Sequence, residues 1–565
     1  MSHDVAHLLA VARGERAPDL VIEGARVFSA FTREWLDVDV GVADGRIAGF
    51  APAAGGQRID GRGRHLVPGF VDAHVHVESS KLSVEEFSRL LLARGTTTVV
   101  ADPHEFANVL GAPGIEWFLE ASARVPLDVF VMVPSCVPAS PLESAHGPLG
   151  PDEMRGLLDK PGVLGIAEMM NFPAVIAGDE AELAKLALAL GGNIDGHAPG
   201  VLGAQLDAYL AAGIRTDHET TQWEEALERR RRGAWVLIRE ASNARNLEAL
   251  LELVRRHGPE RCAFCTDDRE PDMLLREGHL DQMCRAAVAH GIAAEDALLM
   301  ASLHPALCHG LTDRGAIPPG HRADLVLLED LEGFEAALVI KDGQVVERGA
   351  ATRVTVPGWL RTTVNIAPVR AADLRVPARG ARVRVIEMVP DQLLTFAREA
   401  DPKTDDGAVV ADPARDLAKI AVIERHHATG RVGLGFVNGF GLQRGAFAST
   451  VAHDAHNIIV VGVDDEAMAA CVARLAELGG GIVVVDGERT VELPLPVAGL
   501  VSDAPAEEVV ERLDAAHAAL ADMGVGLSAP LMALSFLGLS VIPSLKLTDH
   551  GLVDVERGEI VPLEV

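Results

Sequence analysis

Residues 67–80 read Val-Pro-Gly-Phe-Val-Asp-Ala-His-Val-His-Val-Glu-Ser-Ser, an apolar run that carries His74 and His76 near its end. Side chains of a β-strand alternate between its two faces, so both imidazoles are predicted to lie on the same face. Two imidazoles on one face can hold a single divalent ion. A His-x-His pair alone is a weak indication, because a strand can carry two histidines for purely structural reasons.

The sequence around this stretch alternates short β-rich runs with longer helical segments. The predicted strands are 97–101, 129–133, 163–167, 234–238 and 263–266, and the predicted helices include 82–94, 180–190 and 247–257. Such alternation indicates parallel βαβ units, and about 250 residues is the usual size of a (β/α)8 barrel. An open doubly wound sheet is the alternative, but no Gly-x-Gly-x-x-Gly follows the first strand to support it.

Hairpin-like strands flank this region on both sides. Residues 19–60 alternate apolar and polar positions around an Asp-Gly turn, and residues 322–349 repeat that texture. We therefore expect the barrel to span 66–314 and the flanks, 1–65 and 315–360, to form one small composite β-sandwich domain.

The last 200 or so residues have a different character, with hairpins, glycine-rich turns and two clear helices near 464–478 and 506–523. We expect residues 361–565 to form a C-terminal α+β domain. The predicted fold class is thus α/β, a barrel with two additional domains.

Composition limits the function. The 565 residues include 51 Lys and Arg against 82 Asp and Glu, a formal net charge of −31, which argues against a broad basic face for nucleic acid. Six cysteines make no disulfide framework. No leader sequence and no apolar run of about 20 residues is apparent. We expect a cytoplasmic protein without nucleic-acid or membrane partners.

Further residues that can bind metal stand where predicted strands meet turns. In a barrel these positions gather at the rim formed by the C-terminal ends of the strands, where such enzymes hold their active sites. Four imidazoles and two carboxylates suit two ions of the Zn, Mn or Fe type, and a glutamate can give one oxygen to each ion. The predicted ligands are His74, His76, Glu168, His197, His218 and Asp267.

The sequence resembles the amidohydrolase superfamily and, within it, the adenine deaminase family. The resemblance covers nearly the whole chain and is carried by segments in the barrel and in the C-terminal region. The barrel segments are PGFVDAHVHVESS (68–80), TTTVVADPHEFANVLG (96–111), GIAEMMNFP (165–173), DGHAPG (195–200), DHE (217–219) and CTDDREPD (265–272). The C-terminal segments are KIAVIERHHATGRVGLGFVNGFG (419–441) and STVAHDAHNIIVVG (449–462).

This resemblance implies hydrolytic deamination of adenine to hypoxanthine and ammonia by a hydroxide that bridges two metal ions, in purine salvage. It implies that His74 and His76 bind the more buried ion and that His197 and His218 bind the outer one. Glu168 stands where many relatives carry a carboxylated lysine and bridges both ions. We expect Mn or Fe, with Zn as an alternative, and a homo-oligomer, with a dimer favoured.

The chemistry needs a base and an acid. Asp267 is expected to accept the proton of the attacking hydroxide and to pass it to the departing amine. The acid that protonates the purine ring is open between Glu105, His104 and a second role for Glu168. Other residues expected to line the pocket are Ser79, Ser80, Asp268 and Arg269.

Two other functions remain open at this point. One is a cyclic amidohydrolase of the dihydroorotase or hydantoinase type, against which Glu168 in place of a bridging lysine counts. The other is a non-catalytic scaffold, which typically loses metal ligands. The histidines of the C-terminal region fit a second metal site, a cover over the barrel mouth or a structural role, and stay unassigned: His426, His427, His453 and His456.

Overall fold

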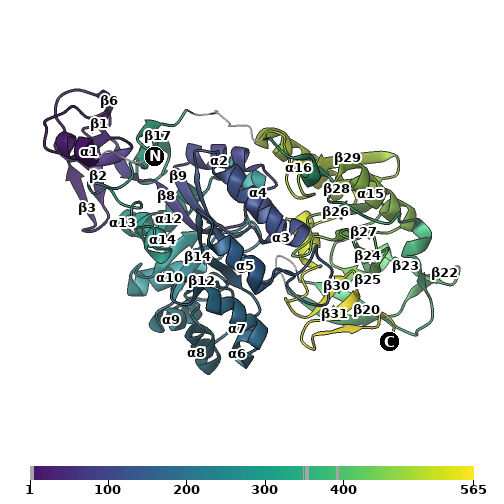
Figure 1. The fold of residues 1–565 in the computed structure, drawn as a ribbon. Helices are drawn as coiled ribbons and strands as arrows, with labels where there is room; N and C mark the ends of the chain where they lie inside the picture. Colours follow the sequence, from purple (N-terminus) through teal and green to yellow (C-terminus); the bar gives the residue numbers. More distant parts are fainter. Residues whose placement is uncertain (1–4, 348, 350–354, 390–393) are drawn as a thin grey trace.

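The computed structural model describes residues 5–347, 349, 355–389 and 394–565 (Figure 1). Residues 1–4, 348 and 350–354 of the predicted composite domain lie outside the described residues, as do residues 390–393 of the predicted C-terminal domain. Among the described residues, no helix is both long enough and apolar enough to cross a bilayer.

Two parallel sheets form the centre of the molecule. Five strands follow one another in the order β12-β11-β10-β9-β8, and three more in the order β13-β14-β15. Every pairing within these sheets is parallel. Their bounds are β8 (Phe70–Val75), β9 (Thr96–Ala101), β10 (Asp128–Val133), β11 (Val163–Met169), β12 (Asn193–Gly196), β13 (Thr216–Asp217), β14 (Trp235–Arg239) and β15 (Cys262–Cys265).

Backbone hydrogen bonds also connect the two sheets to each other. On one side, Asp267 N–H donates to the carbonyl of His74 at 3.0 Å, and His76 N–H donates to the carbonyl of Asp267 at 3.3 Å. On the other side, Arg215 N–H donates to the carbonyl of Ile194 at 3.0 Å. The hydrogen bonds between Asp267 and the two histidines are important for function, because they place Asp267 beside His74 and His76.

Helices alternate with these strands and lie around them (Figure 1). The helix predicted at 247–257 has these bounds in the structure, because leucines at helical spacing bury one face and Gly258, with φ of 74°, ends it. The bounds are α2 (Val84–Ala93), α3 (His104–Leu110), α4 (Ala112–Ser122), α5 (Pro151–Leu158), α6 (Phe172–Ala177), α7 (Glu180–Leu186), α8 (Gly203–Ala211), α9 (Trp223–Arg231), α10 (Leu247–His257), α11 (Pro271–Arg276), α12 (Leu280–Ala289), α13 (Ala294–Ala301) and α14 (Leu303–Cys308).

Strands from both flanks of this region share one sheet. In the order β18-β17-β16-β7-β2-β3, the strand β7 pairs antiparallel with β16 across more than 250 residues of sequence. A second sheet has the order β5-β4-β1-β6, and α1 (Val5–Ala12) packs on it. The bounds are β1 (Leu20–Glu23), β2 (Arg26–Ser29), β3 (Glu34–Asp37), β4 (Val40–Ala43), β5 (Arg46–Gly49), β6 (Gln57–Asp60), β7 (His65–Pro68), β16 (Leu325–Leu328), β17 (Ala336–Lys341) and β18 (Gln344–Val345).

The C-terminal region is built on an eight-stranded sheet with the order β21-β20-β25-β24-β27-β26-β28-β29, and small sheets of three strands accompany it. The two predicted helices are present as α15 (Asp465–Leu478) and α16 (Ala506–Asp522), followed by α17 (Pro530–Phe536). The strands are β19 (Val376–Pro377), β20 (Val383–Met388), β21 (Thr395–Ala400), β22 (Lys403–Asp405), β23 (Ala408–Val410), β24 (Leu417–Ile423), β25 (Val432–Asn438), β26 (Ala446–Ser449), β27 (Ile458–Gly462), β28 (Gly481–Asp486), β29 (Arg489–Pro494), β30 (Leu545–Thr548), β31 (Gly551–Asp554) and β32 (Glu559–Val561).

This region lies against the side of the central sheets where α3 is found (Figure 1). Ser502 N–H donates to the carbonyl of Lys81 at 2.8 Å, next to the segment that follows β8. The loop after β10 is tied down as well, since Ser144 donates its backbone N–H and its hydroxyl to the two carboxylate oxygens of Asp549. The C-terminal region therefore packs close to the ends of the strands that carry the predicted ligands.

Candidate metal centre

His74 of β8 and His76, which follows β8 directly, point to a common place. His74 Nε2 lies 3.1 Å from His76 Nε2, and His76 Nε2 lies 3.1 Å from Asp267 Oδ1. His76 Nδ1 is 2.9 Å from the carbonyl oxygen of Asp102, which accepts only if Nδ1 carries the proton. This contact leaves Nε2 of His76 facing the carboxylates, and Nε2 is the nitrogen that this imidazole would offer to a metal.

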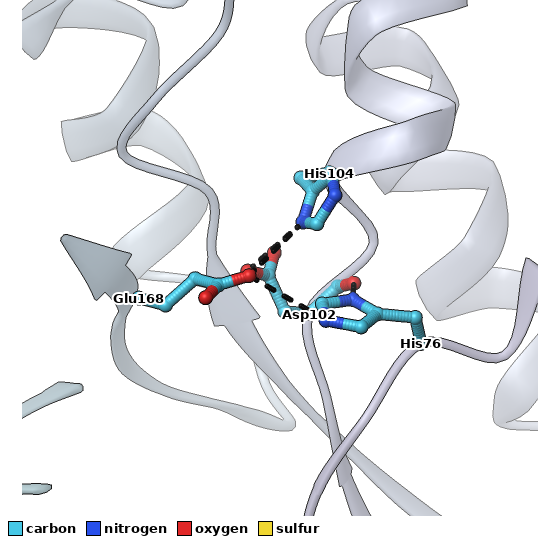
Figure 2. A group of neighbouring side chains, drawn as sticks. All are labelled: His76, Asp102, His104 and Glu168. Atoms are coloured by element: carbon cyan, nitrogen blue, oxygen red, sulfur yellow. Dashed lines mark hydrogen bonds and ion pairs between the residues drawn. The ribbon is translucent and has the colours of Figure 1, made fainter. Parts of the chain in front are cut away.

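Glu168 stands between two groups of imidazoles at the end of β11. Its Oε1 lies 3.5 Å from His76 Nε2, while its Oε2 lies 2.6 Å from His197 Nδ1 and 3.2 Å from His218 Nε2. Figure 2 shows the Glu168 side chain reaching across to His76 and His104. The two oxygens of one carboxylate thus face the two groups of histidines.

Asp267 follows β15 and is held by its backbone and by its side chain. Its Oδ2 accepts a hydrogen bond of 2.8 Å from Arg239 Nη1, and Arg239 also pairs with Glu219. Burial alone raises the pKa of Asp267, but Arg239 and the neighbouring histidines outweigh burial and hold it well below its usual value. Asp267 is therefore an anion in the folded protein.

The donor set is suited to divalent cations. Two of the groups of residues whose ligand atoms lie within 4.8 Å of one another contain predicted ligands alone: His74, His76 and Asp267 form one, and His74, Glu168 and His218 form the other. Burial lowers the pKa of His74 well below its usual value, and His218 and His76 lower it further, so this imidazole is neutral. The pKa of Glu168 is also held well below its usual value, because His197 and His218 outweigh the effect of burial.

In the absence of metal, protons balance these buried carboxylates. Although burial lowers the pKa of His197, Glu219 and Glu168 raise it to about 9. A divalent cation replaces such protons when it binds, which makes metal affinity fall at acid pH. Buried carboxylates and imidazoles with lone pairs facing one point are the donors that Zn, Mn and Fe accept.

The other residues predicted for the pocket lie close by, except for Ser80 and Arg269. His104 Nδ1 is 3.6 Å from Glu168 Oε1 and 3.3 Å from Asp102 Oδ2. Ser79 Oγ lies between two carboxylates, 3.2 Å from Glu105 Oε1 and 2.5 Å from Asp268 Oδ1. Burial, and secondarily Asp267, raises the pKa of Asp268. Ser80 donates to the carbonyl of Val77 and serves the turn after β8.

The predicted place of Arg269 in the pocket also does not agree with its contacts. Its guanidinium donates to the backbone carbonyls of Glu240, Gly278 and His279 and to the side chain of Gln282. The side chain is 1% exposed. Arg269 thus holds loops together behind the pocket, because its neighbours offer it carbonyl oxygens there.

Four residues around the centre were not predicted from the sequence. Arg239 ends β14, Glu219 follows His218, and Asp102 supports both His76 and His104. The fourth, Asp454, comes from the C-terminal region and lines the same pocket together with His453. The position of Arg239 at the end of a predicted strand was a usable signal, whereas Asp454, 187 residues beyond Asp267 (454 − 267) in sequence, gives none.

Arg239→Met is expected to destabilise the metal-free protein by about 3–5 kcal/mol, because it leaves Asp267 and Glu219 buried without their shared cation. Arg239→Lys keeps the charge but loses the planar fork that serves both carboxylates, and a smaller loss is expected. Denaturant unfolding of the metal-free proteins measures both losses. Equal stability of the methionine variant and the parent would contradict the ion-pair assignment.

Comparison with known proteins agrees with this site. Residues 65–346 match the Amidohydrolase family, and residues 392–559 match the Adenine deaminase C-terminal domain. The region that carries the strands and the candidate metal centre is thus an amidohydrolase domain.

Relatives that match over their full length show to which family of amidohydrolases the chain belongs. The chain is 48% identical to an adenine deaminase of Cereibacter sphaeroides over 100% of both chains. It is 44% identical to adenine deaminase 2 of Carboxydothermus hydrogenoformans, over 99% of this chain and 100% of the relative. It is 46% identical to an adenine deaminase of Nitratidesulfovibrio vulgaris over 97% of each. The chain belongs to the adenine deaminase family.

Proposed function

We propose that this protein hydrolyses adenine to hypoxanthine and ammonia, as a step of purine salvage. The observation that carries the proposal is the position of Glu168, whose two oxygens face separate groups of histidines beside an anionic Asp267. Full-length similarity to adenine deaminases supports adenine as the substrate.

The predicted ligands divide into two groups around Glu168. His74 and His76 would hold one divalent ion, with Asp267 beside them, and His197 and His218 would hold the other. When bound, the two ions would supply hydroxide at neutral pH, because coordination lowers the pKa of water. We expect Mn or Fe, and the same donor set also accepts Zn.

Asp267 is the proposed general base. Its Oδ1 faces the histidines of β8, while its Oδ2 is held by Arg239. This fixed, anionic carboxylate takes the proton of the attacking nucleophile as the bond to C6 forms, and it passes a proton to the amino group as ammonia leaves. Arg239 positions Asp267 and does not itself need to touch the substrate.

The proposed acid for the purine ring is Glu105, with His104 as a pocket residue. Glu105 Oε2 lies 3.8 Å from His76 Nδ1 and forms no hydrogen bond within the described part of the chain. Ser79 and Asp268 adjoin Glu105, so a proton can reach this group through polar neighbours. Glu105 therefore offers a carboxyl oxygen within the buried polar cluster around the candidate metal centre.

We also propose the domain organisation that was expected from the sequence. Backbone hydrogen bonds connect the two central sheets on both sides, from Asp267 to His74 and from Arg215 to Ile194, and they support a closed (β/α)8 barrel over residues 66–314. The pairing of β7 with β16 supports a composite β domain made from 1–65 and 315–360. Residues 361–565 would then be the C-terminal domain.

The purified protein, loaded with Mn or Fe, is expected to release ammonia from adenine and not from cytosine, and to hold two metal ions per chain. Ammonia assay and elemental analysis on one preparation check both points. A chain loaded with two ions that hydrolyses dihydroorotate or a hydantoin, and leaves adenine intact, would instead support a cyclic amidohydrolase. A chain that binds no metal would remove both enzymatic assignments.

A further inference from the structure

One loop of the C-terminal region reaches into the pocket above the candidate metal centre. This loop joins β26 to β27 and presents His453 and Asp454, which line the pocket together with His76, Glu168 and Asp267. Asp454 Oδ1 lies 3.8 Å from His104 Nε2 and 3.6 Å from His453 Nδ1. Both residues are buried: His453 is 4% exposed and Asp454 is 2% exposed. The proposed mechanism uses neither of them.

The loop brings polar atoms that have nothing to bind within the described residues. His453 Nε2 and Asp454 Oδ2 are fully buried and form no hydrogen bond there. An unpaired buried polar group costs about 1–3 kcal/mol, so native proteins nearly always pair such groups. Two unpaired polar atoms on adjacent residues of a pocket therefore point to a ligand that pairs with both.

Apolar side chains form the walls beside these two residues. Phe536, Leu539, Ile542 and Met170 line the same pocket. The ring of His453 stacks on Phe536, with 4.5 Å between ring centroids and 11° between planes. Apolar walls with a few polar groups at one end suit a heteroaromatic ring.

The charges of the two residues match one edge of a purine base. Burial raises the pKa of Asp454, but His104 and His453 outweigh burial and lower it, so this group is an acceptor. Burial lowers the pKa of His453, but Asp454 and the carboxylates of Asp268 and Glu105 raise it, so this group is a donor. A free purine base presents a donor, N9–H, next to an acceptor, N3.

We propose that Asp454 and His453 bind the N9–H and N3 edge of the free base, and that this subsite makes the enzyme select bases over N9-substituted purines such as nucleosides. The inference rests on the proposed function, since it assumes a purine whose C6 faces the metal centre. A substituent at N9 removes the donor and leaves the Asp454 carboxylate buried without a partner. Sites built to pair with a substrate N–H reject analogues that lack it strongly.

Calorimetric binding to the full-length, metal-loaded protein tests the subsite without depending on turnover. The probes are hypoxanthine, which carries N9–H, and 9-methylhypoxanthine, which does not. The parent protein is expected to bind hypoxanthine at least about 100-fold more tightly. Asp454→Ala is expected to reduce this preference to within about 5-fold, chiefly by weakening the binding of hypoxanthine.

Two further variants separate the alternatives. Asp454→Asn keeps the shape and loses the charge, and an intermediate preference of about 10-fold is expected. Asp522→Asn, an exposed aspartate of the same region that pairs with Arg489, is the matched control and should leave the preference unchanged. Melting temperature and metal content are measured for each variant, so that a folding defect is recognised.

Three results would overturn the proposal. The first is a parent protein that binds both probes equally. The second is an Asp454→Ala variant that keeps the full preference, because the discrimination would then not depend on an acceptor at residue 454. The third is a loss of one metal ion per chain in Asp454→Ala, which would make the loop a cation site, since His104, His453 and Asp454 also lie within 4.8 Å of one another. Tight, N9–H-dependent binding without ammonia release would leave the subsite standing and remove the proposed reaction.

Discussion

Asp267→Asn is expected to lower kcat for adenine by about 10³-fold, the range that a well-placed general base contributes. An amide has nearly the shape of the carboxylate, so the backbone contacts of Asp267 with β8 should persist. It cannot accept a proton, however, and the reaction loses both the base and the carrier of the proton to ammonia. Steady-state kinetics with adenine measures the effect.

Metal content must be measured on the same Asp267→Asn preparation. In Asp267, Oδ1 faces His76 while Oδ2 accepts a hydrogen bond from Arg239. The amide of asparagine has a single acceptor oxygen, so it can serve only one of these two neighbours. Some loss of metal affinity is therefore expected, and rates are compared per metal-loaded chain. Asp272→Asn, on the adjacent helix α11, is the control that should behave like the parent. A near-normal rate in Asp267→Asn would show that another group is the base.

Much of the region of the central parallel sheets was predictable because local sequence determines it. Strands such as β9 (Thr96–Ala101) are short runs rich in β-branched residues and bounded by turn residues, and α10 has its leucines at helical spacing. One boundary that shifted did so through capping. The helix predicted from residue 82 begins at Val84, since Ser83 caps it by accepting a hydrogen bond from Glu86 N–H.

The candidate centre was predictable for the same reason, and its surroundings were not. His74, His76 and Glu168 stand at strand ends, where chain direction alone places them on one rim. Asp454 reaches this rim only because β26 and β27 pack in another sheet of the chain, a contact that no local pattern records. Arg269 was misplaced because it adjoins Asp268 in sequence while the chain turns its side chain toward backbone carbonyls.

Glu168→Gln is expected to remove at least one of the two metal ions and to lower adenine turnover by about 10³-fold. A neutral amide offers one oxygen where the carboxylate offers two, so it cannot face both groups of histidines with an acceptor. The loss of charge also removes a cause of the raised pKa of His197, which should fall from its value of about 9 in the metal-free protein. Elemental analysis after gel filtration and NMR titration of the histidines measure these changes.

Glu182→Gln is the matched control, because Glu182 is a half-buried glutamate of the same region that pairs with Lys185 away from the centre. It should keep two metal ions and the parental rate. Full metal occupancy with full activity in Glu168→Gln would exclude Glu168 as the bridging ligand. Besides Asp267, whose Oδ1 lies 3.1 Å from His76 Nε2, the carboxylate of Glu105 also lies near this imidazole, with its Oε2 3.8 Å from His76 Nδ1. The same experiment therefore separates the bridging role of Glu168 from the acid role proposed for Glu105, since Glu105→Gln is expected to keep both ions while it loses turnover.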